Sequence, residues 1–230
     1  SRSLQNSAMQ TKFTRASPSP RYRRLLEQYR LMHVNGETHL GIPPEQTFPG
    51  MSLPKEAPHI KRLIKQTGAT TILDYGCGKG QQYWPRRMVD PDEGIDYPDV
   101  KSYWGIAEVR CYDPAYSPFS ELPTGTFDGV ICTDVLEHCP EEDIPWILAE
   151  LFGYARKFVY ANVACFPARK RLPSGGNAHC TIQPVRWWQD RIAQAARPKP
   201  EIRYEVRLAY IKQDQIKIRV LASEAVNAEQ

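Results

Sequence analysis

The chain has 230 residues, of which 41% are hydrophobic and 24% are charged. This length can bury one large core, and no apolar run approaches the length of a membrane span, so we expect a globular domain and exclude a membrane protein. The formal charge of +4 is too small an excess to identify nucleic acid as the partner. Six scattered cysteines without a C-x-x-C pair, and no signal-peptide pattern, predict a cytoplasmic protein with reduced thiols.

The N-terminal region is predicted to differ from the rest of the chain. Residues 1–20 mix serine, proline, glutamine and basic residues without periodicity, which predicts a disordered arm ahead of a single domain over 21–230. We take Met9 as a candidate native start, which would make 1–8 a cloning remnant. Apolar residues at helical spacing then predict an amphipathic helix over 21–33 that lies on the body of the domain.

The middle of the chain alternates between predicted helices and strands. Residues 34–54 are expected to form a loop, and the next helix to begin near Pro58 and end at Gly68. Further helices are expected to start at Pro140 and near Pro184. Short β-branched and apolar runs predict four buried strands, at 71–75, 109–112, 127–133 and 157–164.

The last part of the chain changes to a period of two. Apolar residues alternate from Ile202 to Tyr210 and again from Ile216 to Val220, which predicts an antiparallel hairpin. Strands that alternate with helices predict a mostly parallel sheet. The expected fold class is therefore α/β and Rossmann-like, with helices flanking the sheet and a C-terminal antiparallel hairpin.

A glycine-rich turn follows the first predicted strand, in the sequence Thr71-Ile-Leu-Asp-Tyr-Gly-Cys-Gly-Lys-Gly80. Such glycines let the backbone pass close to a ligand, while a following helix presents free N–H groups. The spacing does not fit the dinucleotide pattern G-x-G-x-x-G, because Gln81 stands where the third glycine is required. It also lacks the Gly-Lys-Ser/Thr ending of a P-loop.

The turn resembles the first motif of class I S-adenosylmethionine-dependent methyltransferases, in which an acid closes strand one ahead of G-x-G-x-G. The resemblance continues at Cys111-Tyr-Asp-Pro114, where the second strand ends, and at 127–138, which looks like strand four and the following helix in the small-molecule branch of the family. It implies the class I methyltransferase fold, S-adenosylmethionine as cofactor, and methyl transfer to an oxygen or nitrogen of a small-molecule acceptor.

The resemblance also implies which residues bind the cofactor. These are Asp74, Gly76, Gly78 and Gly80 around its methionine end, with Cys77 in the same turn, Asp113 at its ribose, and Thr133 and Asp134 on its sulfonium side. The alternative interpretation is a tight turn followed by a strand-end cap.

One region departs from the family pattern. Only fourteen residues separate Asp113 from Asp128, too few for the usual third strand and its helices, so this part of the sheet should be shortened. The aromatic segment 82–108 is a candidate cover for the shortened edge or for the cofactor, and packing into the core is the alternative.

His138 and His179 are the candidate catalytic bases, because imidazole titrates near neutral pH. His138 follows the strand predicted at 127–133, at the end of the sheet where the cofactor is expected, and its alternative role is a helix cap. His179 lies in a glycine-containing loop after the next strand, and an ordinary loop position is its alternative. Cys139 and Cys180 follow the two histidines, but adjacent His-Cys pairs are unlike common zinc motifs, so we expect no metal.

Two other functions stay open at this stage. Arg169, Lys170 and Arg171 precede the His179 loop and would attract an anionic acceptor or RNA, so a nucleic-acid methyltransferase is the second hypothesis. A catalytically silent binding protein with the cofactor fold is the third. The pattern predicts no particular oligomeric state.

Overall fold

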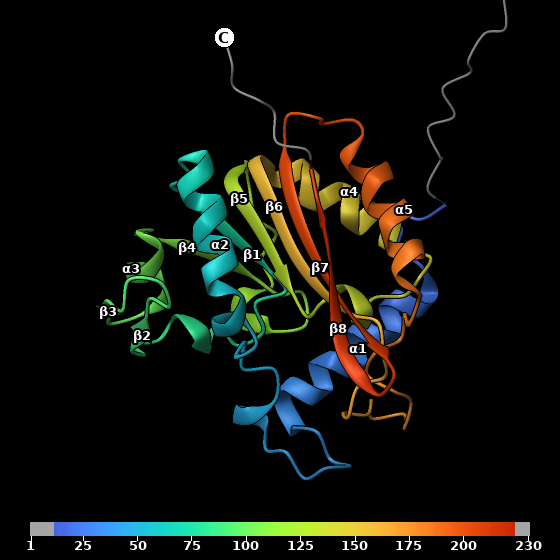
Figure 1. Cartoon of the computed structure of the whole chain (residues 1–230). Helices are drawn as coiled ribbons and strands as arrows, with labels where there is room; N and C mark the ends of the chain where they lie inside the picture. Colours follow the sequence, from blue (N-terminus) through green and yellow to red (C-terminus); the bar gives the residue numbers. More distant parts are fainter. Residues whose placement is uncertain (1–11, 224–230) are drawn as a thin grey trace, which may run out of the picture.

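A computed structural model describes residues 12–223; the suggested start at Met9 and the stretch 1–8 lie outside this range. The central element is a six-stranded sheet in the order β4-β1-β5-β6-β7-β8, in which only β8 runs antiparallel to its neighbour (Figure 1). Its strands are β1 (Ile72–Tyr75), β4 (Val109–Tyr112), β5 (Phe127–Thr133), β6 (Ala155–Ala164), β7 (Arg203–Lys212) and β8 (Gln215–Ala222). The structure is therefore α/β with a mostly parallel sheet and a C-terminal antiparallel hairpin.

Helices cover both faces of the sheet and its carboxyl end. On one face lie α2 (Leu53–Thr67) and α3 (Val100–Trp104), on the other α4 (Ile144–Tyr154) and α5 (Val185–Ala196), and α1 (Pro20–Asn35) crosses the ends of the strands (Figure 1). The described chain also has a small hairpin and four short 3-10 helices: β2 (Met88–Val89), β3 (Asp96–Tyr97), η1 (Pro44–Gln46), η2 (Gln81–Tyr83), η3 (Ser117–Phe119) and η4 (Leu136–His138).

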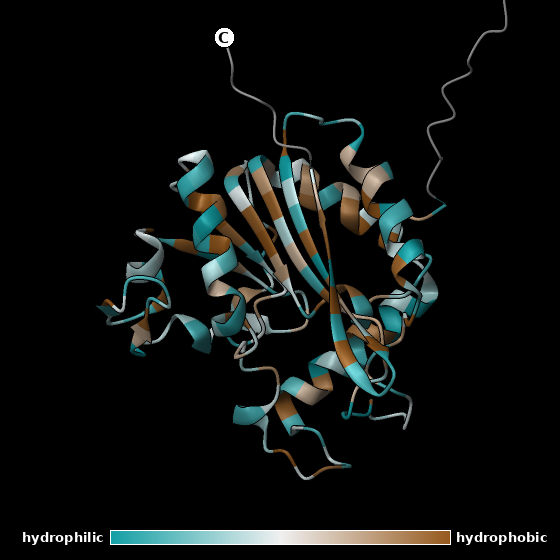
Figure 2. Cartoon of the chain, viewed as in Figure 1, coloured by the Kyte–Doolittle hydropathy of each residue, from teal (hydrophilic) through white to brown (hydrophobic). Residues whose placement is uncertain are grey.

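The core forms two layers because successive side chains of a strand point to opposite faces. In β1, Ile72 packs with α2, whereas Leu73 and Tyr75 belong to the cluster under α4 and α5. Figure 2 shows the hydrophobic residues concentrated along the central strands and on the helix faces turned toward them. Burial on both faces explains why the central strands β1, β5 and β6 are mostly runs of apolar residues, whereas β7 and β8 alternate.

Two helices begin at other residues than the sequence indicates. Helix α2 begins at Leu53, so Pro54 takes the first-turn position expected for Pro58, which lies inside the helix instead. Helix α4 begins at Ile144 and not at Pro140. The residues between form a turn, and the buried Asp143 carboxylate at its end accepts a hydrogen bond from the Ser19 backbone N–H at 3.0 Å.

Residues 12–19, expected as the end of a disordered arm, instead lie against the domain. The Arg15 guanidinium forms an ion pair with Glu150 and donates hydrogen bonds to the hydroxyls of Tyr75, at 2.6 Å, and Tyr112, at 2.9 Å. These contacts, all to residues far along the chain, hold the segment in front of α1 on the α4 side of the sheet.

The predicted shortening after Asp113 is confirmed: between β4 and β5 the chain forms only turns and η3, and β4 is an edge strand of the described sheet. The aromatic segment 82–108 packs beside α2. Tyr103 and Trp104 are buried there, and the Trp104 indole donates to the Ala57 carbonyl oxygen at 3.0 Å. The segment does not line the cavity described below, so core packing, and not a cover for a cofactor, is what the structure has.

Candidate functional site

A cavity of about 670 Å³ opens at the carboxyl ends of the parallel strands, where α1 crosses them. Its walls are the turns after β1, β4 and β5, the end of β6 with residues 166–170 after it, helix α1 and the loop over 46–52. Parallel sheets bind ligands at the end where successive connections leave in opposite directions, and here the chain goes from β1 to β4 on one side and then to β5 on the other. The volume suits a small molecule.

The cavity brings together most of the site residues predicted from the sequence. Those that line it are Gly76, Gly78, Asp113, Thr133, Asp134, His138 and His179. Asp74, Cys77 and Gly80 do not line it. Asp74 shares the α2-facing side of β1 with Ile72, because residues two apart in a strand point the same way.

The side chain of Asp74 is engaged within the protein. Its Oδ2 accepts hydrogen bonds from Gln82 Nε2, at 2.9 Å, and from the Tyr83 hydroxyl, at 2.7 Å. Burial raises the pKa of this carboxyl to about 6. Asp74 therefore fixes the segment after the glycine turn, and it contributes no atom to the cavity wall.

The glycine turn is not an open anion cradle. Gly76 and Gly78 have φ of 87° and 59°, a region that glycine adopts without strain. The N–H groups that follow are already paired: Gly78 donates to Asp113 Oδ2, and Lys79 donates to the Phe48 carbonyl oxygen, each at 2.9 Å. The 3-10 helix η2 follows the turn in place of the expected α-helix. The turn thus docks the 46–52 loop and does not present free donors.

Asp113 directly follows β4 and lines the cavity. Its Oδ1 accepts from the Ala115 backbone N–H, and its Oδ2 from the Gly78 N–H, both at 2.9 Å. Each carboxylate oxygen keeps a second lone pair for a ligand hydroxyl. Burial is the main reason that its pKa is raised to about 6, so the group is largely ionised at neutral pH.

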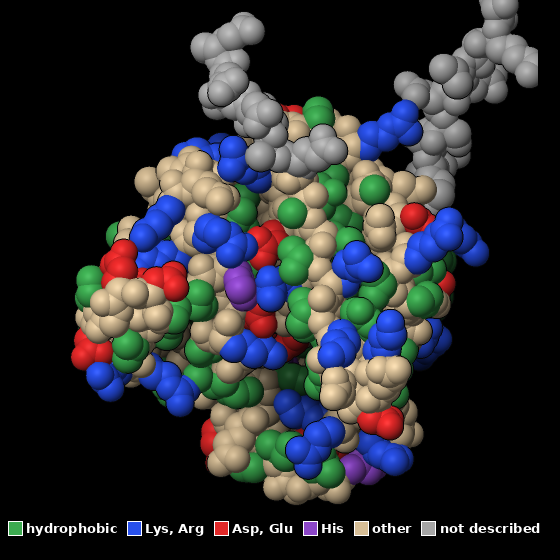
Figure 3. Space-filling model, viewed as in Figure 1, with side chains coloured by type: hydrophobic (Ala, Val, Ile, Leu, Met, Phe, Trp, Pro, Cys, Tyr) green, Lys and Arg blue, Asp and Glu red, His purple; other side chains and the backbone are tan. Residues whose placement is uncertain are grey.

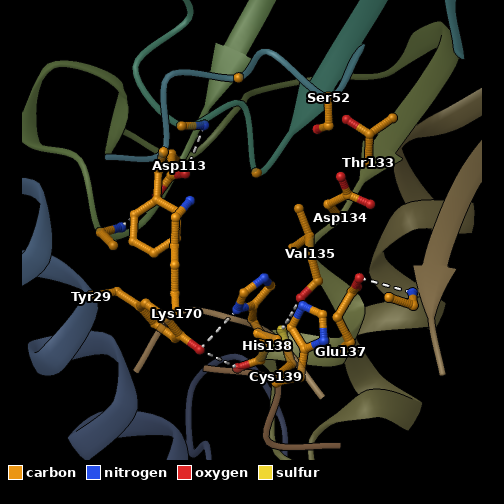
Figure 4. Close-up of a pocket in the computed structure, with 18 of the residues that line it drawn as sticks. Tyr29, Ser52, Asp113, Thr133, Asp134, Val135, Glu137, His138, Cys139 and Lys170 are labelled. Carbon is orange, nitrogen blue, oxygen red and sulfur yellow. Dashed lines mark hydrogen bonds between the residues drawn. The ribbon is translucent and has the colours of Figure 1, made fainter. Parts of the chain in front are cut away.

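Two more acidic residues follow β5 on the wall shown in Figure 4. Asp134 has a φ of 53°, which is strained for a residue with a side chain, and a reciprocal pair of hydrogen bonds with Asn162, at 2.9 and 2.7 Å, holds it there. Glu137 is fully buried, and its Oε1 accepts from the Ala164 N–H at 2.9 Å. Burial, and secondarily the charge of Asp134, raise the pKa of Glu137 to about 8. Glu137 is therefore protonated at neutral pH.

The two histidines lie against each other, with ring centroids 4.8 Å apart and nearly perpendicular planes. His138 Nδ1 is 2.9 Å from the Ala178 carbonyl oxygen and His179 Nδ1 is 2.6 Å from that of Phe166. A carbonyl only accepts, so both Nδ1 atoms carry the proton and both Nε2 atoms keep a lone pair. Burial lowers the pKa of His138 to about 3 and also lowers that of His179. Both rings are neutral at physiological pH.

Cationic side chains also line the cavity: Lys55 in α2, and Arg169 and Lys170 in the loop after β6. Among the described residues none of the three has a carboxylate oxygen within 4 Å, whereas buried or half-buried cations elsewhere, such as Lys61 with Asp90, form close ion pairs. On the face seen in Figure 3, lysine and arginine side chains are spread over the surface with carboxylates between them and form no continuous basic stripe.

Sequence reasoning missed the part of the wall that precedes the first strand. Tyr29 of α1 donates to the Ala178 carbonyl oxygen at 2.7 Å and its hydroxyl lies 3.2 Å from His138 Nδ1. Phe48 and Ser52 come from the loop between α1 and α2. The apolar stripe of α1 indicated that this helix packs on the domain, but nothing in it indicated where, and Phe48 lies in a stretch without periodicity.

Comparisons with known proteins identify no relative. No family model matches the chain, and neither the curated proteins nor the solved structures contain a significant match. Over 12–223, no three His, Cys, Asp or Glu side chains gather in a way that could hold a metal ion. The helices of that range are all too short or too polar to cross a membrane. Any functional assignment must therefore rest on the motifs and on the geometry of the cavity.

Proposed function

We propose that this protein is an S-adenosylmethionine-dependent methyltransferase that moves a methyl group to an oxygen or nitrogen of a small-molecule acceptor. The observation that carries the proposal is the convergence, in one cavity, of a strand-end carboxylate and two neutral imidazoles with free Nε2 atoms: Asp113, His138 and His179. Asp113 matches the acidic residue of the cofactor motif in the sequence. The two imidazoles supply the base that an acceptor needs if it must lose a proton.

The cavity residues fit the proposed cofactor. Asp113 would accept hydrogen bonds from the ribose hydroxyls, and Asp134 supplies negative charge for a sulfonium. Ser52 and Lys55 lie at the start of α2, where a helix N-terminus and an ammonium both favour the carboxylate of the methionine part. Oε2 of the neutral Glu137 is buried without a partner in the described chain, and a polar ligand would provide one. The bound cofactor would supply an electrophilic methyl group.

The two histidines have different roles toward the acceptor. A general base is most effective when its pKa lies near the working pH, and burial lowers the pKa of His138 to about 3. We therefore assign proton removal to Nε2 of His179, whose hydrogen bond to Phe166 acts against the lowering of its pKa. His138 packs edge-on against that ring and orients it, and Tyr29 in turn holds His138.

Calorimetric titration of S-adenosylhomocysteine tests the proposal. Saturable binding is expected, and Asp113→Ala should weaken it at least about tenfold, because a hydrogen bond to a charged group contributes about 1.5–3 kcal/mol. Asp113→Asn keeps one acceptor oxygen and should have an intermediate effect. Asp96→Ala, which removes an exposed carboxylate of β3 far from the cavity, is the matched control and should bind normally.

Either of two results would contradict the proposal. Absence of binding to the wild-type protein would leave a catalytically silent scaffold as the better interpretation. Equal binding by wild type and Asp113→Ala would mean that the ligand sits elsewhere than in this cavity.

A further inference from the structure

Lys170 lines the cavity, and over residues 12–223 its ammonium has no carboxylate oxygen within 4 Å. It is half-buried, and its ammonium lies 4.9 Å from the centroid of the Phe48 ring. Burial lowers its pKa, while Glu37 and Asp134 act on it from beyond ion-pair distance. The Glu37 carboxylate is engaged with the backbone N–H groups of His39, at 2.9 Å, and Leu40, at 2.8 Å. A partly desolvated ammonium in this position is stabilised when an anion binds next to it.

Lys170 belongs to the same part of the cavity as the proton acceptors. Its charge contributes to the lowered pKa of both His138 and His179. Figure 4 shows its side chain extended along the cavity on the Tyr29 side of His138. An anionic group held by this ammonium would therefore place the rest of its molecule next to the imidazole pair.

The side chains around Lys170 determine which kind of molecule can bind next to it. This side of the cavity is built by α1 and by the residues after β6, and its surface is mostly apolar and aromatic. The side chains concerned are Leu25, Leu26, Tyr29, Phe48 and Phe166. Such a wall binds a compact apolar or aromatic body by removing it from water, and it offers few partners to a sugar or a nucleotide.

A competing source of negative charge is the carboxylate of the cofactor itself. Figure 4 shows Ser52 beside Thr133 at one end of the cavity and Lys170 at the other. Lys55 lies in the first turn of α2, three residues after Ser52. The start of α2 therefore suits the cofactor carboxylate, which leaves Lys170 for a second anion.

We propose that the methyl acceptor is an organic anion with an apolar or aromatic body, and that Lys170 binds its anionic group next to the histidine pair. This inference rests on the proposed function, because only a methyltransferase needs an acceptor in addition to its cofactor. Arg169, exposed beside Lys170, would draw the anion toward the cavity from solution.

The test uses two fluorescent probes that differ only in the presence of an anionic sulfonate group. The probes are 8-anilinonaphthalene-1-sulfonate and its uncharged counterpart N-phenyl-1-naphthylamine, each titrated into the full chain with saturating S-adenosylhomocysteine. Lys170→Gln should weaken binding of the sulfonate at least about tenfold and leave the neutral probe unchanged. Lys170→Arg, which keeps the charge, should retain most of the sulfonate affinity. Lys217→Gln, on the exposed strand β8, is the matched control.

Two outcomes overturn the inference. One is sulfonate binding that Lys170→Gln leaves unchanged although circular dichroism shows the variant folded. The other is a loss of S-adenosylhomocysteine affinity in Lys170→Gln with unchanged sulfonate binding, which would assign the lysine to the cofactor carboxylate. A separate titration of S-adenosylhomocysteine alone into the wild type keeps the two proposals distinct: charge-dependent probe binding without cofactor binding would support the anion site and refute the methyltransferase.

Discussion

Replacing Glu137 by glutamine should remove a pH dependence of stability that the buried carboxyl creates. The folded protein keeps this group protonated up to about pH 8, whereas the same group in the unfolded chain loses its proton near its ordinary pKa of 4.5. Between these values the folded state binds more protons than the unfolded state, so the free energy of unfolding falls as the pH rises. Each pH unit in this window costs about 1.4 kcal/mol.

Over the range from pH 5 to pH 7.5, the wild-type protein should thus lose about 3 kcal/mol of unfolding free energy through Glu137 alone. Glutamine keeps an oxygen for the Ala164 N–H and does not ionise. The stability of Glu137→Gln minus that of the wild type should therefore increase by about 3 kcal/mol over this range.

Urea unfolding of both proteins at several pH values measures this difference, and all other titrating groups cancel in the subtraction. Glu141→Gln makes the same substitution at an exposed neighbouring position and is the matched control. A flat difference for Glu137→Gln would mean that Glu137 is ionised in the folded protein, and the neutral carboxyl assigned to the cavity wall would be wrong.

Two further predictions concern the base and the N-terminal segment. For any acceptor that is methylated, His179→Ala should lower kcat by about 10²–10⁴-fold without changing the Kd of S-adenosylhomocysteine. Because the pKa of His179 is lowered, the wild-type rate should stay constant on acidification until the pH falls below the ordinary histidine pKa of 6.5. Equal rates for variant and wild type would exclude His179 as the base. Arg15→Ala should lower the free energy of unfolding by roughly 2 kcal/mol, because Glu150 and two tyrosine hydroxyls lose their donor. If chemical denaturation finds the variant as stable as the wild type, the contacts of Arg15 do not anchor residues 12–19 to the domain.

The central strands were predictable because burial on both faces of the sheet requires runs of consecutive apolar residues, which are visible in the sequence. The runs at Val109–Tyr112 and Phe127–Thr133 match β4 and β5 residue for residue. Helix starts were harder, because a proline favours a first turn without requiring it: two prolines compete in α2, and the one at 140 begins a turn instead. Where a helix begins also depends on tertiary contacts, such as the one between Ser19 and Asp143 ahead of α4.

The site was predictable to the extent that motifs place side chains at strand ends. Asp113, His138 and His179 follow parallel strands, and parallel strands end at one edge of a sheet, so their meeting follows from topology. The direction of Asp74 depends on which face of β1 each residue takes, and the motif alone does not contain that information. The contributions of Tyr29 and Phe48 depend on long-range packing of α1, for which no local pattern exists.

The wall that α1 and the 46–52 loop build has a consequence for protein engineering. The sequence motifs begin only at β1, so a fragment trimmed to start there would keep the sheet and the carboxylates of Asp74 and Asp113. It would lose Tyr29 and Phe48 and with them one side of the cavity. Affinity handles and fluorescent reporters therefore belong after β8, because this strand runs antiparallel to β7 and ends beside the start of β7, at the opposite end of the sheet from the cavity.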